Sequence, residues 1–245
     1  MGELLKVDGV IKRFGGLTAV NDVSFTVAQG DILGLIGPNG AGKTTLFNLL
    51  VGIHPLDGGT VTFNQSSITN LRPHAICERG MTKTFQNVSL FPDMTVLDNV
   101  LVGGLLRLSV ADARDLARQN LERVGLAGIA DKLSNDLSFP EKARVELAQV
   151  LCTGPRLLLL DEVMAALNNQ EMDEVLNLIQ SLQEHDGLTF IVIEHHMRAI
   201  MTRCSRIVAL NFGKKIAEGT PREVADDPLV IEAYLGSAAV HGAPA

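Results

Sequence analysis

The sequence predicts an α/β fold: a core of mainly parallel sheet, an antiparallel β subdomain beside it, and a helical subdomain inserted into it. Over residues 157–210, apolar strands alternate with amphipathic helices, an order typical of a parallel sheet. Period-2 stretches at 23–27 and 61–63 predict the antiparallel strands. Between about residues 88 and 153 the spacing becomes helical, which predicts the insertion.

The core elements are predicted from apolar runs and helix signals. The stretches 156–161, 189–193 and 207–210 are short and mainly apolar, and they fit buried parallel strands. A helix is expected between the first two, with one apolar face formed by Met172, Val175, Leu176, Ile179 and Leu182. Ser109 is a predicted N-cap, with Asp112 three positions on, for a helix that ends near Gly125.

A glycine-rich loop follows the apolar stretch 31–36 and leads into the helical stretch 46–50. Its spacing fits a nucleoside-triphosphate loop: backbone N–H groups surround the phosphates, Lys43 reaches the β and γ oxygens, and the Thr44 hydroxyl holds Mg²⁺. The alternative is a glycine-rich turn without chemistry, against which strand, loop and helix all argue. We therefore expect the loop to bind ATP or GTP. Its residues are Gly37, Pro38, Asn39, Gly40, Ala41, Gly42, Lys43, Thr44 and Thr45.

Two acidic residues end the leucine-rich strand. Ligands of α/β sheets bind beyond the carboxyl ends of strands, so Asp161 and Glu162 should face the phosphates. Asp161 is expected to hold Mg²⁺ through water, and Glu162 to polarise the attacking water or accept its proton. The alternative is that the two acids only stabilise the N-terminus of the following helix. The glycine loop elsewhere in the sequence favours the functional interpretation.

His195 and Gln86 complete the predicted catalytic set. His195 follows the strand 190–194 and should lie at the same sheet edge, where an imidazole can contact the γ-phosphate. A metal site shared with His196 or a solvent-facing role are the alternatives, although adjacent histidines point apart. Gln86 follows the segment 81–85, and its amide is expected to reach Mg²⁺ or the attacking water.

Composition limits the remaining classes. The chain of 245 residues carries a net charge of -7, which argues against binding to a nucleic-acid backbone. Three scattered cysteines fit reduced thiols, and no apolar run approaches the roughly 20 residues that span a bilayer. With no secretory signal at the start, a cytoplasmic protein is expected. We predict one domain over residues 1–236 and a flexible tail over 237–245.

These motifs, in this order, resemble the ATP-binding subunit of ABC transporters over nearly the whole chain. The resemblance implies ATP and Mg²⁺ as ligands and ATP hydrolysis as the activity. It implies that Phe14 stacks on adenine, although an aromatic after an apolar strand is more often core. The remaining implied roles are Walker A for residues 37–45, Q-loop for Gln86, Walker B for Asp161 and Glu162, switch histidine for His195, and helical subdomain for 88–153.

Three further stretches, 13–20, 84–96 and 218–236, resemble the branched-chain amino-acid importer branch. ATPases of urea and lipopolysaccharide transporters have similar sequences in these stretches. Subunits of those transporters therefore stay alternatives. The implied partners are a second ATP-binding subunit in a homo- or heterodimer, transmembrane permease subunits contacted through a groove near residues 86–99, and indirectly a substrate-binding protein. The implied location is peripheral, on the inner face of the cell membrane.

The chain departs from the family pattern at two places. The signature, usually Leu-Ser-Gly-Gly-Gln, aligns with residues 137–141, where Ser138 remains but both glycines are absent. Pro140 has no N–H, so the resemblance implies the loss of one hydrogen bond to γ-phosphate in the partner's site, worth about 1.5–3 kcal/mol. The alternative interpretation is a capping box, with Ser138 and Glu141 starting the helix 141–152. Asn168 stands where the family commonly has aspartate, so coupling between the two sites is expected to differ.

Two other functions stay open at this stage. A soluble ABC ATPase of repair, translation or cluster assembly would carry the same Walker motifs. A nucleotide-binding regulatory subunit that barely hydrolyses ATP is suggested by the unusual signature.

Overall fold

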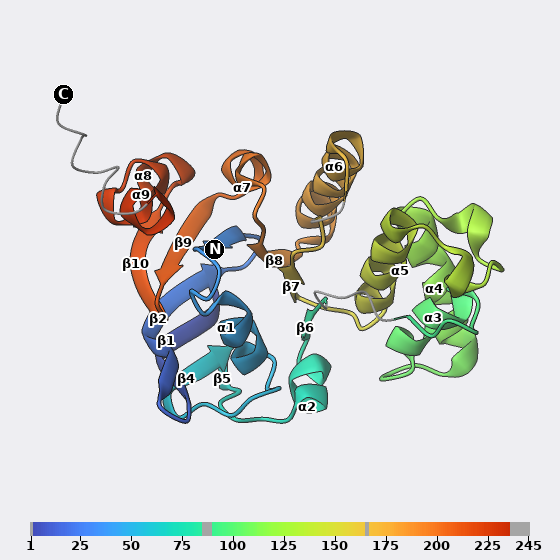
Figure 1. The fold of residues 1–245 in the computed structure, drawn as a ribbon. Helices are drawn as coiled ribbons and strands as arrows, with labels where there is room; N and C mark the ends of the chain where they lie inside the picture. Colours follow the sequence, from blue (N-terminus) through green and yellow to red (C-terminus); the bar gives the residue numbers. More distant parts are fainter. Residues whose placement is uncertain (1, 85–89, 165–166, 236–245) are drawn as a thin grey trace.

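The computed structural model describes residues 2–84, 90–164 and 167–235 (Figure 1). Its larger sheet has the strand order β10-β9-β3-β8-β7-β6, in which only the edge strand β10 runs antiparallel to its neighbour. The mainly parallel core predicted from the sequence is thereby confirmed. These strands are β3 (Ile32–Ile36), β6 (Met81–Lys83), β7 (Leu157–Asp161), β8 (Thr189–Ile193), β9 (Arg206–Asn211) and β10 (Lys214–Gly219).

A second, antiparallel sheet has the order β2-β1-β4-β5. The stretches 23–27 and 61–63 lie in its strands, as their alternation predicted. Helix α1 (Lys43–Leu50) follows β3 and packs between the two sheets, as Figure 1 shows. The strands are β1 (Glu3–Phe14), β2 (Leu17–Ala28), β4 (Gly58–Phe63) and β5 (Ser66–Ser67), and α2 (Pro73–Glu78) leads from this sheet back to β6.

The helices that follow β7 cover the opposite face of the larger sheet (Figure 1). Helix α6 carries the predicted apolar face, with all five of its side chains buried. These helices are α6 (Asn169–Asp186), α7 (Met197–Arg203), α8 (Pro221–Ala225) and α9 (Pro228–Leu235). Nowhere in the described part of the chain is a helix long and apolar enough to cross a lipid bilayer.

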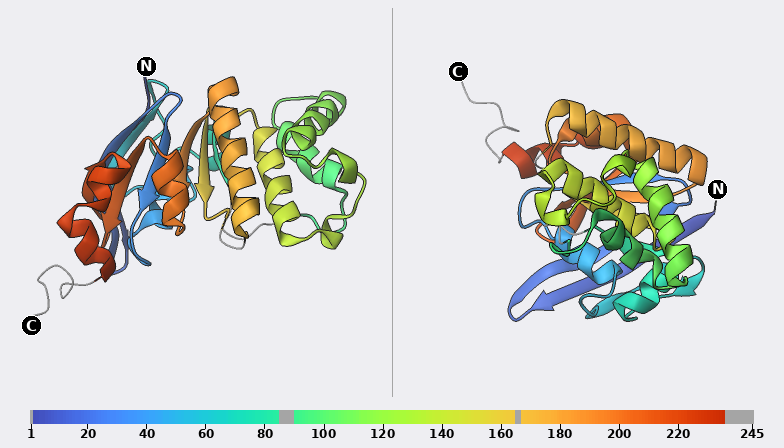
Figure 2. Two further views of the ribbon diagram at one scale, coloured as in Figure 1. Left: turned by 90° about the horizontal axis from the view of Figure 1, so that it is seen from above. Right: turned by 90° about the vertical axis from the view of Figure 1, so that its right-hand side faces the viewer.

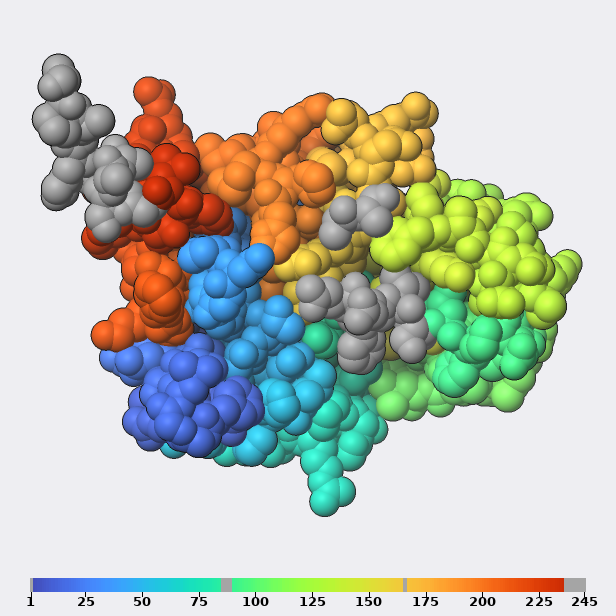
Figure 3. Space-filling model, in the orientation of Figure 1, coloured from blue at the N-terminus to red at the C-terminus, as the bar shows by residue number. Residues whose placement is uncertain are grey.

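Between β6 and β7 the described chain is helical and forms one end of the molecule (Figures 2 and 3). The Ser109 hydroxyl accepts a hydrogen bond from the Asp112 N–H at 3.2 Å, which confirms this N-cap. The elements are α3 (Val96–Gly104), α4 (Val110–Arg123), α5 (Phe139–Leu151) and two short 3₁₀ turns, η1 (Ala127–Ile129) and η2 (Ser134–Asp136).

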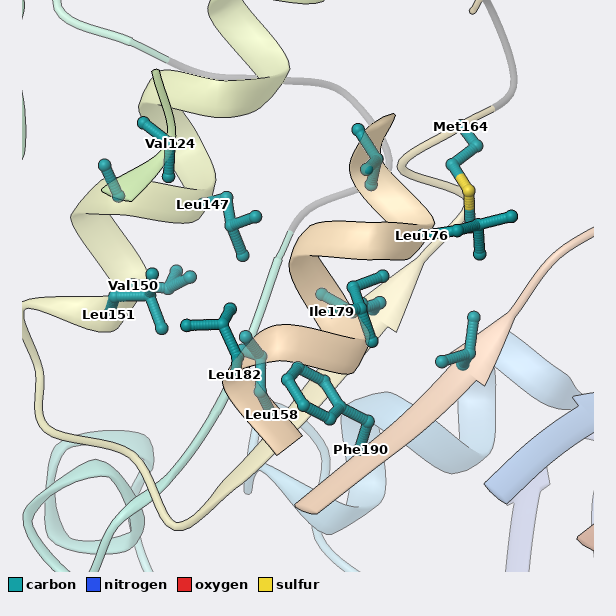
Figure 4. Close-up of a cluster of buried hydrophobic side chains, with 14 of the residues drawn as sticks. Val124, Leu147, Val150, Leu151, Leu158, Met164, Leu176, Ile179, Leu182 and Phe190 are labelled. Carbon is teal, nitrogen blue, oxygen red and sulfur yellow. The ribbon is translucent and has the colours of Figure 1, made fainter. Parts of the chain in front are cut away.

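Two hydrophobic clusters lie on opposite faces of the larger sheet. Side chains alternate along its strands: Leu157 and Leu159 face α1 and the antiparallel sheet, whereas Leu158 and Leu160 join the cluster beneath α6. Figure 4 shows that this second cluster continues from Leu182 on α6 to Leu147 on α5. The sheet is thus buried on both faces, as its continuous apolar strands predicted.

Candidate nucleotide site

The glycine loop connects the end of β3 to the start of α1. Gly42 lies just before the helix with φ 102°, and a Cβ there would come within 2.5 Å of the Ala19 carbonyl oxygen. Only glycine fits this turn without displacing β2. No side chain caps the first turn of α1. Its backbone N–H groups are therefore available to an anion, and the helix dipole favours one.

Lys43, the first residue of α1, extends over the loop. Its side chain is buried, and Nζ donates to the carbonyl oxygens of Gly37 at 2.7 Å and Pro38 at 3.2 Å. Burial lowers the pKa of Lys43, while the nearby carboxylates of Glu162 and Asp161 oppose that shift. The cation lies against neutral oxygen atoms, which is a suitable arrangement for receiving a phosphate group.

A cavity of about 580 Å³ opens above the loop. The predicted residues Glu162 and His195 line it, together with residues 39–45. The sequence did not reveal its other lining residues, because they reach it from β2 and from the β9–β10 turn. These are Leu17, Thr18, Ala19, Phe212 and Gly213. Phe212 is 84% exposed and has φ 45°, an unusual conformation for a bulky side chain, so it is the most exposed apolar group at the site.

Glu162 and His195 lie side by side although they are 33 positions apart. Parallel pairing of β7 with β8 brings the ends of the two strands together. His195 Nε2 is 2.7 Å from Glu162 Oε1. Glu162 has φ 56°, in the left-handed region, and its N–H donates to the Ile193 carbonyl at 2.9 Å. Strained backbone of this kind is often found at functional sites, and here it brings the carboxylate to the cavity.

Asp161 is fully buried at the carboxyl end of β7. Neither carboxylate oxygen has a hydrogen-bond partner among the described residues. Lys83 Nζ lies 3.8 Å from Oδ2 and donates to Asn48 Oδ1 on α1 at 2.9 Å. Burial raises the pKa of the Asp161 carboxyl, and the Lys83 charge opposes that rise. A buried carboxylate with vacant acceptor positions is suited to a cation.

Five predicted residues that the structure describes do not line this cavity: Phe14, Gly37, Pro38, Ser138 and Asp161. Phe14 is 43% exposed and packs edge-to-face against His54, with ring centroids 5.4 Å apart, so its stacking on adenine stays a prediction. Ser138 starts α5 and is engaged by Glu141. Gln86 lies outside the described residues.

At Ser138 the capping box is complete. The Glu141 carboxylate accepts both the Ser138 N–H at 2.7 Å and the Ser138 hydroxyl at 2.8 Å, and the Glu141 N–H donates back to that hydroxyl. These bonds lower the pKa of Glu141, with the bond from the backbone N–H having the largest effect. The capping interpretation is confirmed, and it places a carboxylate at the N-terminus of α5. Asn168 caps α6 in the same way, with Glu171.

Glu194 is a buried acid that the sequence analysis did not single out. It follows β8 directly, and its Oε1 accepts a hydrogen bond from the Met164 N–H at 2.9 Å. Oε2 has no partner among the described residues. The pKa of Glu194 is raised to about 7, first by burial and then by the charges of Glu162 and Asp161. The sequence signal that could have identified Glu194 is its place between an apolar strand and His195.

Two family models match the chain. Residues 20–165 match the model described as ABC transporter, and residues 214–240 match the one described as branched-chain amino acid ATP-binding cassette transporter. The protein is 41% identical to the high-affinity branched-chain amino acid transport ATP-binding protein LivG of Salmonella typhimurium, over 96% of this chain and 98% of that one. It is 35% identical to the lipopolysaccharide export system ATP-binding protein LptB of Escherichia coli, over 95% and 97%.

Solved structures show the same fold. A nucleotide-free ATP-binding cassette from an ABC transporter superposes with a TM-score of 0.89 at 30% identity, covering 96% of this chain and 100% of that one. A bacterial ABC transporter cassette solved as a dimer superposes with a TM-score of 0.82 at 25% identity, covering 89% and 99%. Together with the phosphate loop and the paired acids after β7, these matches establish that the chain belongs to the ABC transporter family, as an ATP-binding and ATP-hydrolysing subunit.

Proposed function

We propose that this chain energises the uptake of branched-chain amino acids by a membrane importer. The match of residues 214–240 to the branched-chain model supports that cargo, as does the higher identity to LivG than to LptB. The matched segment lies outside the Walker motifs, so it carries information that ATP chemistry alone does not. Lipopolysaccharide export is the second candidate, supported by the LptB match.

We propose that the triphosphate binds across the loop 37–45 and the start of α1. Lys43 Nζ now donates to two carbonyl groups, and its third N–H would bind a phosphate oxygen, which gives the buried cation a charged partner. The uncapped N–H groups of α1 would bind the same phosphates. Leu17 and Phe212, exposed apolar side chains that line the cavity, are proposed to contact the base. Phe14 is proposed to stack on it, as the family resemblance implies.

Mg²⁺ is the divalent cation that fits the donor set. The Asp161 carboxylate is buried and has no hydrogen-bond partner among the described residues, and Thr44 lines the nucleotide cavity. Hard oxygen donors of this kind suit Mg²⁺, which keeps water and phosphate oxygens among its ligands. The described residues contain no group of three or more His, Cys, Asp or Glu side chains suited to a metal, so such an ion depends on the nucleotide for ligands. When bound, it would offset phosphate charge during transfer.

Glu162 and His195 are the proposed catalytic pair. Glu162 would orient a water molecule and accept its proton while the water oxygen bonds to the γ-phosphorus. The bond from the γ-phosphorus to its bridging oxygen breaks, leaving ADP and inorganic phosphate. His195 would hold the Glu162 carboxylate through the 2.7 Å contact and bind a γ-phosphate oxygen. Gln86 is proposed to reach the same water or the cation.

A second ATP-binding subunit is proposed to complete the site, as a copy of this chain or a different one. Ser138 would then face the partner's nucleotide. Its hydroxyl and N–H already bind Glu141, and Pro140 supplies no N–H, so we propose that this half of the interface is weak. Such a chain would contribute to ATP hydrolysis mainly through its own Walker A and Walker B residues.

The proposed permease contact is a groove of about 330 Å³ between the core and the helical end of the molecule. It is lined by Ile53 after α1, by α2, by β6 and by Val102 and Leu106 at the end of α3. Ile53 is 42% exposed and Leu106 is 37% exposed, so apolar surface is available to a partner. None of the described residues 90–99, part of the segment 86–99 expected from the sequence, lines this groove.

Two measurements test this function. Purification from native membranes should recover a transmembrane permease pair with the chain, and adding that pair should raise its ATP turnover. Glu162→Gln should abolish most turnover while ATP still binds, whereas Glu122→Gln, on an exposed position of α4, should leave turnover unchanged. Equal rates for Glu162→Gln and wild type would refute the catalytic assignment. Recovery with soluble partners alone would refute the transport role.

A further inference from the structure

The last described helix, α9, is bonded directly to the phosphate loop. The Tyr234 hydroxyl accepts a hydrogen bond from the Gly37 N–H at 2.8 Å, across 197 positions of sequence. Helix α9 lies within residues 214–240, the segment matched by the branched-chain model. This tyrosine is therefore a link between that segment and the first glycine of the loop.

Gly37 is held on three sides. A Cβ at this position would lie 2.2 Å from the Leu210 carbonyl oxygen, so the end of β9 packs directly against the glycine, whose φ is 149°. Its carbonyl oxygen accepts from Lys43 Nζ at 2.7 Å, and its N–H donates to Tyr234. The position of Gly37 therefore sets the position of one of the two oxygens that hold the Lys43 amine.

The loop is not packed tightly on the side that faces α9. A cavity of about 480 Å³ separates residues 38–41 from Leu229, Glu232 and Ala233. No side chain of the described residues fills that space, so the hydrogen bond from Gly37 to Tyr234 contributes more to holding Gly37.

We propose that Tyr234 is a positioning residue for nucleotide binding. Its hydroxyl holds Gly37, and through the Gly37 carbonyl it holds the Lys43 amine where the phosphates are received. The inference rests on the proposed role of residues 37–45, and it gives the segment 214–240 a role in nucleotide binding. Loss of the hydroxyl leaves the chemistry at Glu162 untouched and weakens the binding of both ATP and ADP.

Tyr234→Phe tests the hydroxyl alone. Loss of one neutral hydrogen bond should raise the dissociation constants of ATP and ADP by about 2- to 10-fold. KM should rise by a similar factor with little change in kcat. Thr69→Val is the matched control, because the Thr69 hydroxyl accepts from a backbone N–H, that of Val61, at 2.9 Å and lies outside the nucleotide cavity. It should lose comparable stability and keep wild-type affinity.

The wild-type chain offers a second readout. It contains one tyrosine and no tryptophan, so its ultraviolet emission comes from Tyr234. Saturating ADP should change that emission, in wild type and in Thr69→Val alike. Wild-type affinity in Tyr234→Phe, or an emission that ADP leaves unchanged, would overturn the inference. If wild type bound neither nucleotide, the role of residues 37–45 would fail, and the inference with it.

Discussion

Replacing Glu194 by glutamine should make the protein more stable at alkaline pH. Glu194 is 3% exposed, and burial is the main cause of a pKa raised to about 7 from the usual 4.5. Because the folded protein holds this proton more tightly than the unfolded chain, the contribution of Glu194 to stability is largest at low pH. It is lost as the pH rises from about 4.5 through about 7.

The size of this loss follows from the two pKa values. Each pH unit between them corresponds to about 1.4 kcal/mol, so the free energy of unfolding should fall by about 3 kcal/mol across the interval. Glutamine carries no charge at any pH and keeps an oxygen to accept from the Met164 N–H. The Glu194→Gln variant should therefore gain up to about 3 kcal/mol relative to wild type between about pH 5 and pH 8.

Urea unfolding of the nucleotide-free protein, followed by circular dichroism at several pH values, measures this difference. Glu122→Gln, at an exposed position, serves as the control and should differ from wild type by a constant amount. A Glu194→Gln difference that stays constant with pH would refute the reasoning, because the carboxyl would then titrate alike in the folded and unfolded states.

Two further predictions concern the helical end of the molecule. Gly103→Ala places a Cβ 2.0 Å from the Gln149 carbonyl oxygen, so it should cost about 1–3 kcal/mol of stability in urea unfolding, whereas Gly128→Ala, with open space around it, should not. A stable Gly103→Ala protein would mean that α3 and α5 separate easily. Pro140→Gly supplies an N–H in the first turn of α5 and should raise the ATP turnover of the assembled transporter about tenfold. Unchanged turnover would show that the missing N–H is not limiting.

Local signals in the sequence were sufficient for the main elements. The leucine run of β7, the period of α6 and the caps at Ser109 and Ser138 depend on residues a few positions apart, and all were predicted correctly. The family motifs likewise identified Glu162 and His195, which the paired strands bring together.

Contacts between distant segments were not predictable in this way. Leu17 and Phe212 line the cavity only because the β9–β10 turn lies beside β2, and nothing local marks either as a site residue. The bond from Tyr234 to Gly37 depends equally on where α9 packs. Phe14 packs against His54 in this structure, and its stacking on adenine, which the family resemblance implies, stays a prediction.

The cluster on the α6 face has a consequence for cooperativity. Leu147 and Val150 of α5 belong to the same continuous group of buried side chains as Leu182 of α6 and Leu158 of β7 (Figure 4). Within residues 90–164 and 167–235, the helical end therefore has no hydrophobic core separate from that of the sheet. Its helices lose their apolar cover when α6 or β7 comes apart, so they should melt with the sheet in one transition rather than as an autonomous folding unit.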